Sequence, residues 1–126
     1  MLFRSTTVHM FMQEKCERVD SKQLEKLLEN VPGPESVTRM AAVFQALQSD
    51  TRLKILFLLK QKEMCVCELE QALSVTQSAV SHGLRTLRQL DLVRVRREGK
   101  FTIYYIADEH VRTLIEMCLE HVEEKA

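Results

Sequence analysis

Apolar residues recur at helical spacing along most of the chain. The first such segment, "SKQLEKLLENV", predicts a short helix that stops at "PGP", because two prolines and a glycine do not continue a helix. The segments "ESVTRMAAVFQALQ" and "SDTRLKILFLLKQ" predict two core helices, the second with Ser49 or Asp50 as its N-cap. Residues 1–20 have no clear period and are predicted to form a mobile arm.

The stretch "CVCELEQALSVTQSAVSHGLRTLRQLDLV" predicts a short helix, a tight turn and a second helix. We expect helices at Glu68–Leu73 and Gln77–Leu90, with "SVT" between them. Polar side chains line one face of the second helix: Gln77, Ser78, Ser81, His82, Arg85 and Thr86. This is the helix-turn-helix pattern, in which the second helix enters the major groove, although a helical hairpin with a solvated face shares it.

The next stretch, "LVRVRREGKFTIYYIA", predicts a two-stranded hairpin with a glycine in its turn. Its alternation assigns the apolar positions to Val93, Val95, Phe101, Ile103 and Tyr105. Four basic residues are expected near the tip: Arg94, Arg96, Arg97 and Lys100. A basic hairpin that follows a recognition helix is typical of a wing that contacts phosphates or the minor groove, so DNA binding is favoured over the plain hairpin.

Charge is balanced overall but unevenly distributed. The 126 residues, 45% of them hydrophobic, predict a single domain with 18 basic and 18 acidic residues. Residues 85–100 hold six basic and two acidic residues, whereas residues 108–126 hold six acidic and two basic ones. The first region therefore suits a polyanion and the second suits cations.

No apolar run is long enough to span a bilayer, and "MLFRSTTVHMFMQEK" has no leader pattern. We therefore expect a cytoplasmic protein with no membrane partner and no small organic substrate. The four cysteines are expected to be thiols, metal ligands or core residues rather than disulfides: Cys16, Cys65, Cys67 and Cys118.

Four segments resemble the ArsR/SmtB family of metal-responsive bacterial repressors: "LQSDTRLKILFLL", "EMCVCELEQAL", "TQSAVSHGLRTLRQLDLVRVRREGKFTIYYI" and the terminal "DEH" with "H" and "E". The resemblance runs from about Cys16 to Glu124 and is strongest to zinc and cadmium/lead sensors. It implies a mostly α winged helix-turn-helix with a small β-hairpin, and a homodimer whose N- and C-terminal helices form the interface. Residues 21–126 would form this DNA-binding and dimerisation domain.

The resemblance also implies that the metal-free homodimer binds operator DNA, expected to be an inverted repeat, and controls metal efflux or resistance genes. Zn(II), Cd(II) or Pb(II) would release it. Many related repressors carry a larger polar residue where this chain has Gly83, so we expect no base contact there. An arsenic-responsive or thiol-redox-responsive repressor of the same fold is the alternative.

Two histidines near the C-terminus are the first candidate metal ligands. His110 and His121 lie within roughly 20° on one helix face but about 16 Å apart along its axis, too far for one ion. In an antiparallel pair of such helices, Asp108 and His110 of one chain would meet His121 and Glu124 of the other. This N/O set suits Zn(II), with Asp108 turning toward the site as N-cap. The alternative is an acidic helix with incidental histidines.

Cys65 and Cys67 form the second candidate site, at a helix start where the dipole favours thiolate ligands. The resemblance suggests that the other subunit's arm completes it through Cys16, with Met12 where cadmium/lead sensors carry a further cysteine and Glu70 where arsenic sensors do. Three thiolates, supplemented by His9 or Glu68, would accept Cd(II), Pb(II), Bi(III) or As(III). Structural cysteines are the alternative, and Cys118 is expected to pack at the interface.

An enzyme is not expected. Cysteines separated by one residue lack the C-x-x-C geometry of thiol oxidoreductases. The sequence offers neither a nucleophile with its base nor a glycine-rich phosphate loop.

Overall fold

The computed structural model describes residues 16–124, and the chain divides into two compact units between Val37 and Thr38. Most of the predicted arm, with His9 and Met12, lies outside the described residues. In the first unit, α2 (Ser21–Glu29) is capped by Asp20, whose Oδ1 accepts the Gln23 N–H at 2.8 Å.

Helix α3 (Pro34–Leu47) starts directly after "PG" with a proline at its first position, where the missing N–H costs no hydrogen bond. Both helices match the sequence prediction, including the break between them. Several apolar side chains in and just after α2 are exposed: Leu24, Leu27, Leu28 and Val31.

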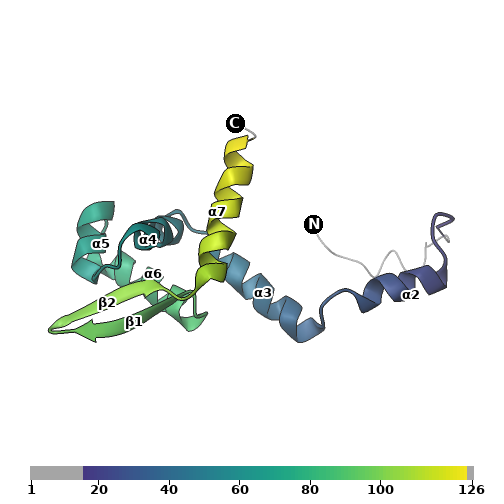
Figure 1. The fold of residues 1–126 in the computed structure, drawn as a ribbon, viewed down its shortest axis with the longest axis horizontal. Coiled ribbons are helices and arrows are strands. Elements are labelled where there is room, and N and C mark those ends of the chain that lie inside the picture. Colours follow the sequence, from purple (N-terminus) through teal and green to yellow (C-terminus); the bar gives the residue numbers. More distant parts are fainter. Residues whose placement is uncertain (1–15, 125–126) are drawn as a thin grey trace. The chain divides into compact units, whose positions relative to one another are not determined.

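The second unit holds the predicted helix-turn-helix and hairpin (Figure 1). The unit begins within α3, and the elements that follow are α4 (Asp50–Gln61), α5 (Val66–Leu73), α6 (Gln77–Gln89), β1 (Val93–Glu98), β2 (Phe101–Ile106) and α7 (Glu109–Glu124). Ser49, not Asp50, is the N-cap of α4, because its Oγ accepts the Arg52 N–H at 3.2 Å. The fold is therefore mostly α with one small antiparallel hairpin, as predicted.

One core gathers residues from every element of this unit. Helix α4 contributes the centre of it, and α6 buries a full stripe against α4. The buried apolar residues include Ile55, Leu56 and Leu59 of α4, Leu69 of α5, Val80, Leu84 and Leu87 of α6, Val93 and Ile106 of the hairpin, and Val111 and Ile115 of α7. Removal of this apolar area from water is the main force that holds α6 in place.

Gly83 belongs to this buried stripe, and its burial gives a physical reason for the expected absence of a base contact at this position. A Cβ built on Gly83 would lie 3.2 Å from Ile55 Cδ1 and 3.4 Å from Arg52 Cγ. Position 83 thus faces α4 rather than solvent. The glycine is there because α6 approaches α4 closely.

The inner face of β2 differs from the predicted one. Cross-strand partners share a face, and Val93 pairs with Ile106 while Val95 pairs with Tyr104. Ile106 is buried and Tyr104 packs against the core, so these residues, not Ile103 and Tyr105, form the inner face. "FTIYYI" is apolar on both faces, and alternation alone does not choose between them.

Helix α7 is fixed to the end of α4 by buried and polar contacts. The Arg112 guanidinium donates to the Lys60 carbonyl at 3.1 Å, and the Lys60 ammonium lies 2.7 Å from the Glu116 carboxylate. These contacts hold the inner face of α7 and leave its outer face exposed, including Met117 and Val122. Within residues 16–124, no helix is long and apolar enough to cross a membrane.

We predict that Gly83→Gln lowers the free energy of unfolding by about 1–3 kcal/mol, because a side chain must be forced between α6 and α4. His82→Gln, which places the same residue at the adjacent exposed position, should change it by less than about 0.5 kcal/mol. Urea unfolding at fixed protein concentration measures both. Equal stabilities would mean that position 83 faces solvent.

Candidate functional site

The outer face of α6 collects five of the six polar residues that the sequence placed on one face of this helix, the face expected to read base edges if the helix enters the major groove. Four of these side chains are exposed and the fifth is half-buried, and together they line one shallow depression: Gln77, Ser78, Ser81, His82 and Arg85. The helix begins with Thr76 as N-cap, whose Oγ1 accepts the Ala79 N–H at 3.1 Å. The inner stripe is buried, so this face is the one turned to solvent.

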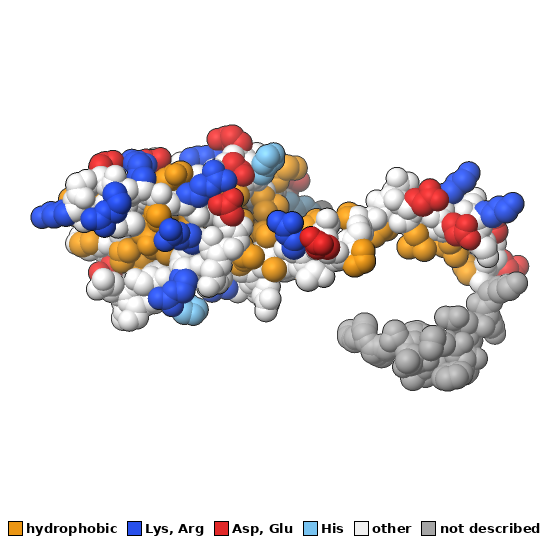
Figure 2. All heavy atoms as spheres, turned by 90° about the horizontal axis from the view of Figure 1, so that it is seen from below, with side chains coloured by type: hydrophobic (Ala, Val, Ile, Leu, Met, Phe, Trp, Pro, Cys, Tyr) orange, Lys and Arg blue, Asp and Glu red, His pale blue; other side chains and the backbone are white. Residues whose placement is uncertain are grey.

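The four basic residues of the hairpin divide into two pairs. Arg97 donates to the Thr102 hydroxyl at 3.1 Å, and the Lys100 ammonium lies 5.6 Å from the Phe101 ring centre. Neither has an acidic partner among the described residues. Figure 2 shows blue side chains at the end of this unit where Figure 1 places the hairpin tip.

Arg94 and Arg96, by contrast, are held by carboxylates. Arg96 pairs with Glu63 and with Glu98, the latter at 3.0 Å. Arg94 donates through Nε and Nη2 to the two oxygens of Asp91, both at 2.9 Å. These hydrogen bonds lower the pKa of the Asp91 carboxyl below its usual range.

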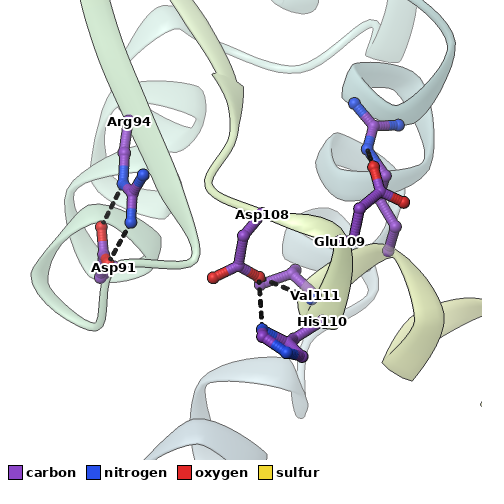
Figure 3. A network of polar contacts seen from close by, with 7 residues as sticks. Asp91, Arg94, Asp108, Glu109, His110 and Val111 are labelled. Carbon is purple, nitrogen blue, oxygen red and sulfur yellow. Dashed lines mark hydrogen bonds and ion pairs between the residues drawn. The ribbon is translucent and has the colours of Figure 1, made fainter.

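Asp108 and His110 lie together at the start of α7 (Figure 3). Asp108 takes the N-cap position, with its Oδ1 accepting the Val111 N–H at 3.1 Å and lying 3.6 Å from His110 Nδ1. The His110 side chain is 96% exposed. We call this pair the N-terminal half-site: one carboxylate and one imidazole, turned together and open to solvent.

His121 and Glu124 are exposed near the other end of α7, and we call them the C-terminal half-site. In the described part of the chain, no three His, Cys, Asp or Glu side chains come close enough to hold a metal ion. Each half-site thus supplies two ligands at most, and one copy of α7 does not bring the two together.

The cysteine pair lies at the start of α5. Cys65 is the half-buried N-cap and Cys67 is exposed, with its sulfur 3.4 Å from the Gln71 amide nitrogen. Glu68 accepts the Cys65 N–H at 3.0 Å and the Lys62 ammonium at 2.8 Å, and these hydrogen bonds, the one from Lys62 first, lower the pKa of its carboxyl. Both carboxylate oxygens are therefore engaged. Cys16 is exposed and belongs to the first unit.

Comparison with known proteins identifies the family. Residues 49–95 match the model of the bacterial regulatory protein arsR family. A Synechocystis sp. transcriptional repressor SmtB homolog is 38% identical over 106 residues, which cover 84% of this chain and 80% of the relative. A Staphylococcus aureus cadmium resistance transcriptional regulatory protein CadC homolog is 40% identical over 88 residues, covering 69% and 73%. The chain belongs to the ArsR/SmtB family.

Solved structures agree with the winged helix-turn-helix. A homodimeric winged helix-turn-helix DNA-binding domain from Mycobacterium bovis superposes with a TM-score of 0.68 at 31% identity, covering 75% of this chain and 92% of that one. HlyU from Vibrio cholerae gives 0.63 at 30% identity, covering 68% and 94%. As an ArsR/SmtB protein, the chain is a DNA-binding transcriptional repressor and not an enzyme.

Arg88 is a candidate contact of this ArsR/SmtB chain that sequence analysis did not select. A second depression, between α6 and the hairpin, is lined by Ser81, Leu84, Arg85, Arg88, Gln89 and Tyr104. Arg88 is exposed one helical turn after Arg85, and neither forms an ion pair among the described residues. The i, i+3 spacing of the two arginines was the available signal.

We predict that Arg97→Ala weakens binding to all DNA sequences alike and reduces the slope of log affinity against log salt by about one unit. The reason is that Arg97 is a free cation on the hairpin, suited to a phosphate. Binding to a specific and to an unrelated duplex at several salt concentrations measures this. A changed sequence preference with an unchanged slope would remove Arg97 from the phosphate contacts.

Proposed function

We propose that this protein represses metal efflux or resistance genes as a homodimer that binds its operator without metal and leaves it when Zn(II) binds. The N-terminal half-site of one copy, Asp108 and His110, would join the C-terminal half-site of its mate, His121 and Glu124. The observation that carries the proposal is the pair of separate, solvent-open half-sites on α7, in which Asp108 already turns toward His110.

An exposed apolar groove supports pairing through α7. It lies between the end of α3, α4 and α7, and it is lined by Phe44, Leu47, Gln48, Leu53, Phe57, Leu114, Ile115, Cys118, Leu119 and Val122. Phe44 is 55% exposed and Val122 57% exposed, and contact of such apolar side chains with water is unfavourable in a monomer. The related M. bovis domain is homodimeric. Cys118 lines this groove, which favours a packing role over ligation.

The donor set fits zinc. Two carboxylates and two imidazoles make a four-ligand N/O site of the kind that Zn(II) occupies in tetrahedral geometry. Zinc, when bound, would join the two chains at both ends of the α7 pair. The hydrogen bond from the Val111 N–H would hold the Asp108 carboxylate in place. The His110 imidazole is exposed, so it could rotate toward the metal without breaking packing contacts.

On the operator, the two α6 helices would enter successive major grooves of an inverted repeat. Gln77, Ser78 and the rest of the outer face of α6 would lie near base edges. Arg97 and Lys100 would meet phosphates, since they are the hairpin cations without an acidic partner among the described residues.

A second metal site is favoured by the accessible cysteines at the start of α5 and by the cadmium-resistance relative. Cys65 and Cys67 would supply two thiolates and Cys16 of the other subunit a third. Such a site accepts Cd(II) or Pb(II), and also Bi(III) or As(III). The same three thiols would serve a redox-responsive repressor, and operator binding titrated separately with each metal and with a mild oxidant distinguishes these inducers.

For the zinc site, we predict that His121→Asn keeps operator affinity but loses the zinc-induced fall of about 5- to 150-fold that coupled sites show. Glu124→Ala should chiefly weaken zinc binding, because a carboxylate ligand is lost. Glu123→Gln, beside it on α7, is the matched control and should behave as the unaltered chain does. If His121→Asn still left DNA normally at saturating zinc, the switch would not lie on α7.

For the cysteine site, we predict an ultraviolet thiolate-to-metal charge-transfer band when Cd(II) is added to the reduced protein. The band should disappear in Cys65→Ser and Cys67→Ser and be reduced in Cys16→Ser. Cys118→Ser is the control, because its thiol lines the apolar groove. An unchanged band in Cys16→Ser would remove the arm from this site.

A further inference from the structure

Arg94 lies at the base of the hairpin, where the recognition helix ends, and not near the tip as the sequence suggested. It pairs with Tyr105 across the strands, one step from the open end of the ladder. Its partner Asp91 has a left-handed backbone with φ of 57°, uncommon outside glycine, and donates its N–H to the Arg88 carbonyl at 3.0 Å. The bidentate Arg94 to Asp91 pair thus joins the hairpin to the C-terminal end of α6.

The same place is joined to the N-terminal half-site. The Ala107 N–H donates to the Leu92 carbonyl at 3.1 Å, and the Leu92 N–H donates to the Leu87 carbonyl of α6 at 2.9 Å. Asp108 follows Ala107 directly, and Figure 3 shows its carboxylate and the Asp91–Arg94 pair in one neighbourhood. Asp91 first, and Asp108 to a smaller extent, raise the pKa of Arg94, so the guanidinium is attracted electrostatically by both carboxylates.

We propose that Arg94 is a positioning residue that transmits metal binding at Asp108 to the recognition helix, and that it does not contact DNA phosphate. The coupling part of this proposal rests on the zinc-switched repressor proposed above. The assignment against phosphate contact does not depend on it.

Two features argue against phosphate contact. Both Nε and Nη2 of Arg94 already meet a carboxylate in bidentate geometry, so a phosphate would have to displace an intact partner. Arg97 and Lys100 are free of acidic partners among the described residues and lie closer to the turn. The phosphates would therefore meet these two cations first.

The route for coupling is short and continuous. Metal ligation that draws Asp108 toward a second chain would displace Ala107, whose N–H is hydrogen-bonded to the Leu92 carbonyl. The N–H groups of Asp91 and Leu92 are hydrogen-bonded to carbonyls in the last turn of α6. The ion pair between Arg94 and Asp91 stiffens the turn between α6 and β1. A stiff turn passes the displacement to α6, whereas a loose turn absorbs it locally.

The test measures operator affinity against salt, with and without saturating Zn(II), for four variants: Arg94→Ala, Arg94→Lys, Asp91→Asn and Arg97→Ala. Asparagine tolerates the left-handed backbone of position 91, so Asp91→Asn removes the charge without adding strain. Circular dichroism and direct zinc titration of each variant establish that it folds and binds metal.

Arg94→Ala and Asp91→Asn should keep the salt slope of the unaltered chain while their zinc-induced loss of affinity falls below about 5-fold, under the usual range for coupled sites. Arg94→Lys should not restore the coupling, because an ammonium lacks the bidentate fork. Arg97→Ala should show the opposite pattern, a slope reduced by about one unit with coupling unchanged.

A slope reduced by about one unit in Arg94→Ala and restored in Arg94→Lys would overturn the proposal and make Arg94 a phosphate contact. Unchanged slopes with undiminished zinc release in Arg94→Ala and Asp91→Asn would overturn the coupling. If the unaltered chain showed no zinc-induced release, the proposed function would fail and the coupling with it, while the slopes would still decide the phosphate assignment.

Discussion

The packing of α6 against α4 is the contact on which the rest of the molecule depends. Val80, Leu84 and Leu87 are almost fully buried, and Gly83 lets the two helices approach closely. Because the inner stripe is fixed, the polar outer face of α6 is turned to solvent, and in the proposed operator complex this face would meet the DNA. The same packing fixes where α6 ends, and the hairpin and the start of α7 are both hydrogen-bonded to that end.

Helix α7 carries the features that a second copy of the chain would complete in the proposed repressor. Its inner face, with Val111 and Ile115, is satisfied within the chain, and Arg112 holds it on the end of α4. The helix also borders the apolar groove that it forms with α3 and α4, and it carries two half-sites that no other described residue completes. A symmetric pair would cover the groove and complete both sites at once, so dimerisation and metal sensing would use the same surface.

Sequence periodicity predicted the helix-turn-helix, the hairpin and the N-cap position of Asp108, because each depends on residues close together in the chain. It failed where distant residues decide. Glu63, which precedes α5, forms an ion pair with Arg96 of the hairpin. A side chain at position 83 would press against Ile55 and Arg52 of α4, which accounts for the glycine there. On β2, which is apolar on both faces, packing against the core places Tyr104 rather than Ile103 on the inner face. The spacing of His110 and His121 suggested two half-sites on one helix face, and the ligand set proposed for zinc would be completed only by another chain.

In the proposed repressor, metal binding on α7 and DNA binding on α6 are thermodynamically linked. The most direct measurement is the zinc affinity of the protein, determined with and without saturating operator DNA at constant ionic strength. Linkage is reciprocal, so DNA should weaken zinc binding by the same factor, about 5- to 150-fold, by which zinc weakens DNA binding. Equal zinc affinities in the two titrations, with zinc bound in both, would mean that the zinc and DNA sites are not coupled.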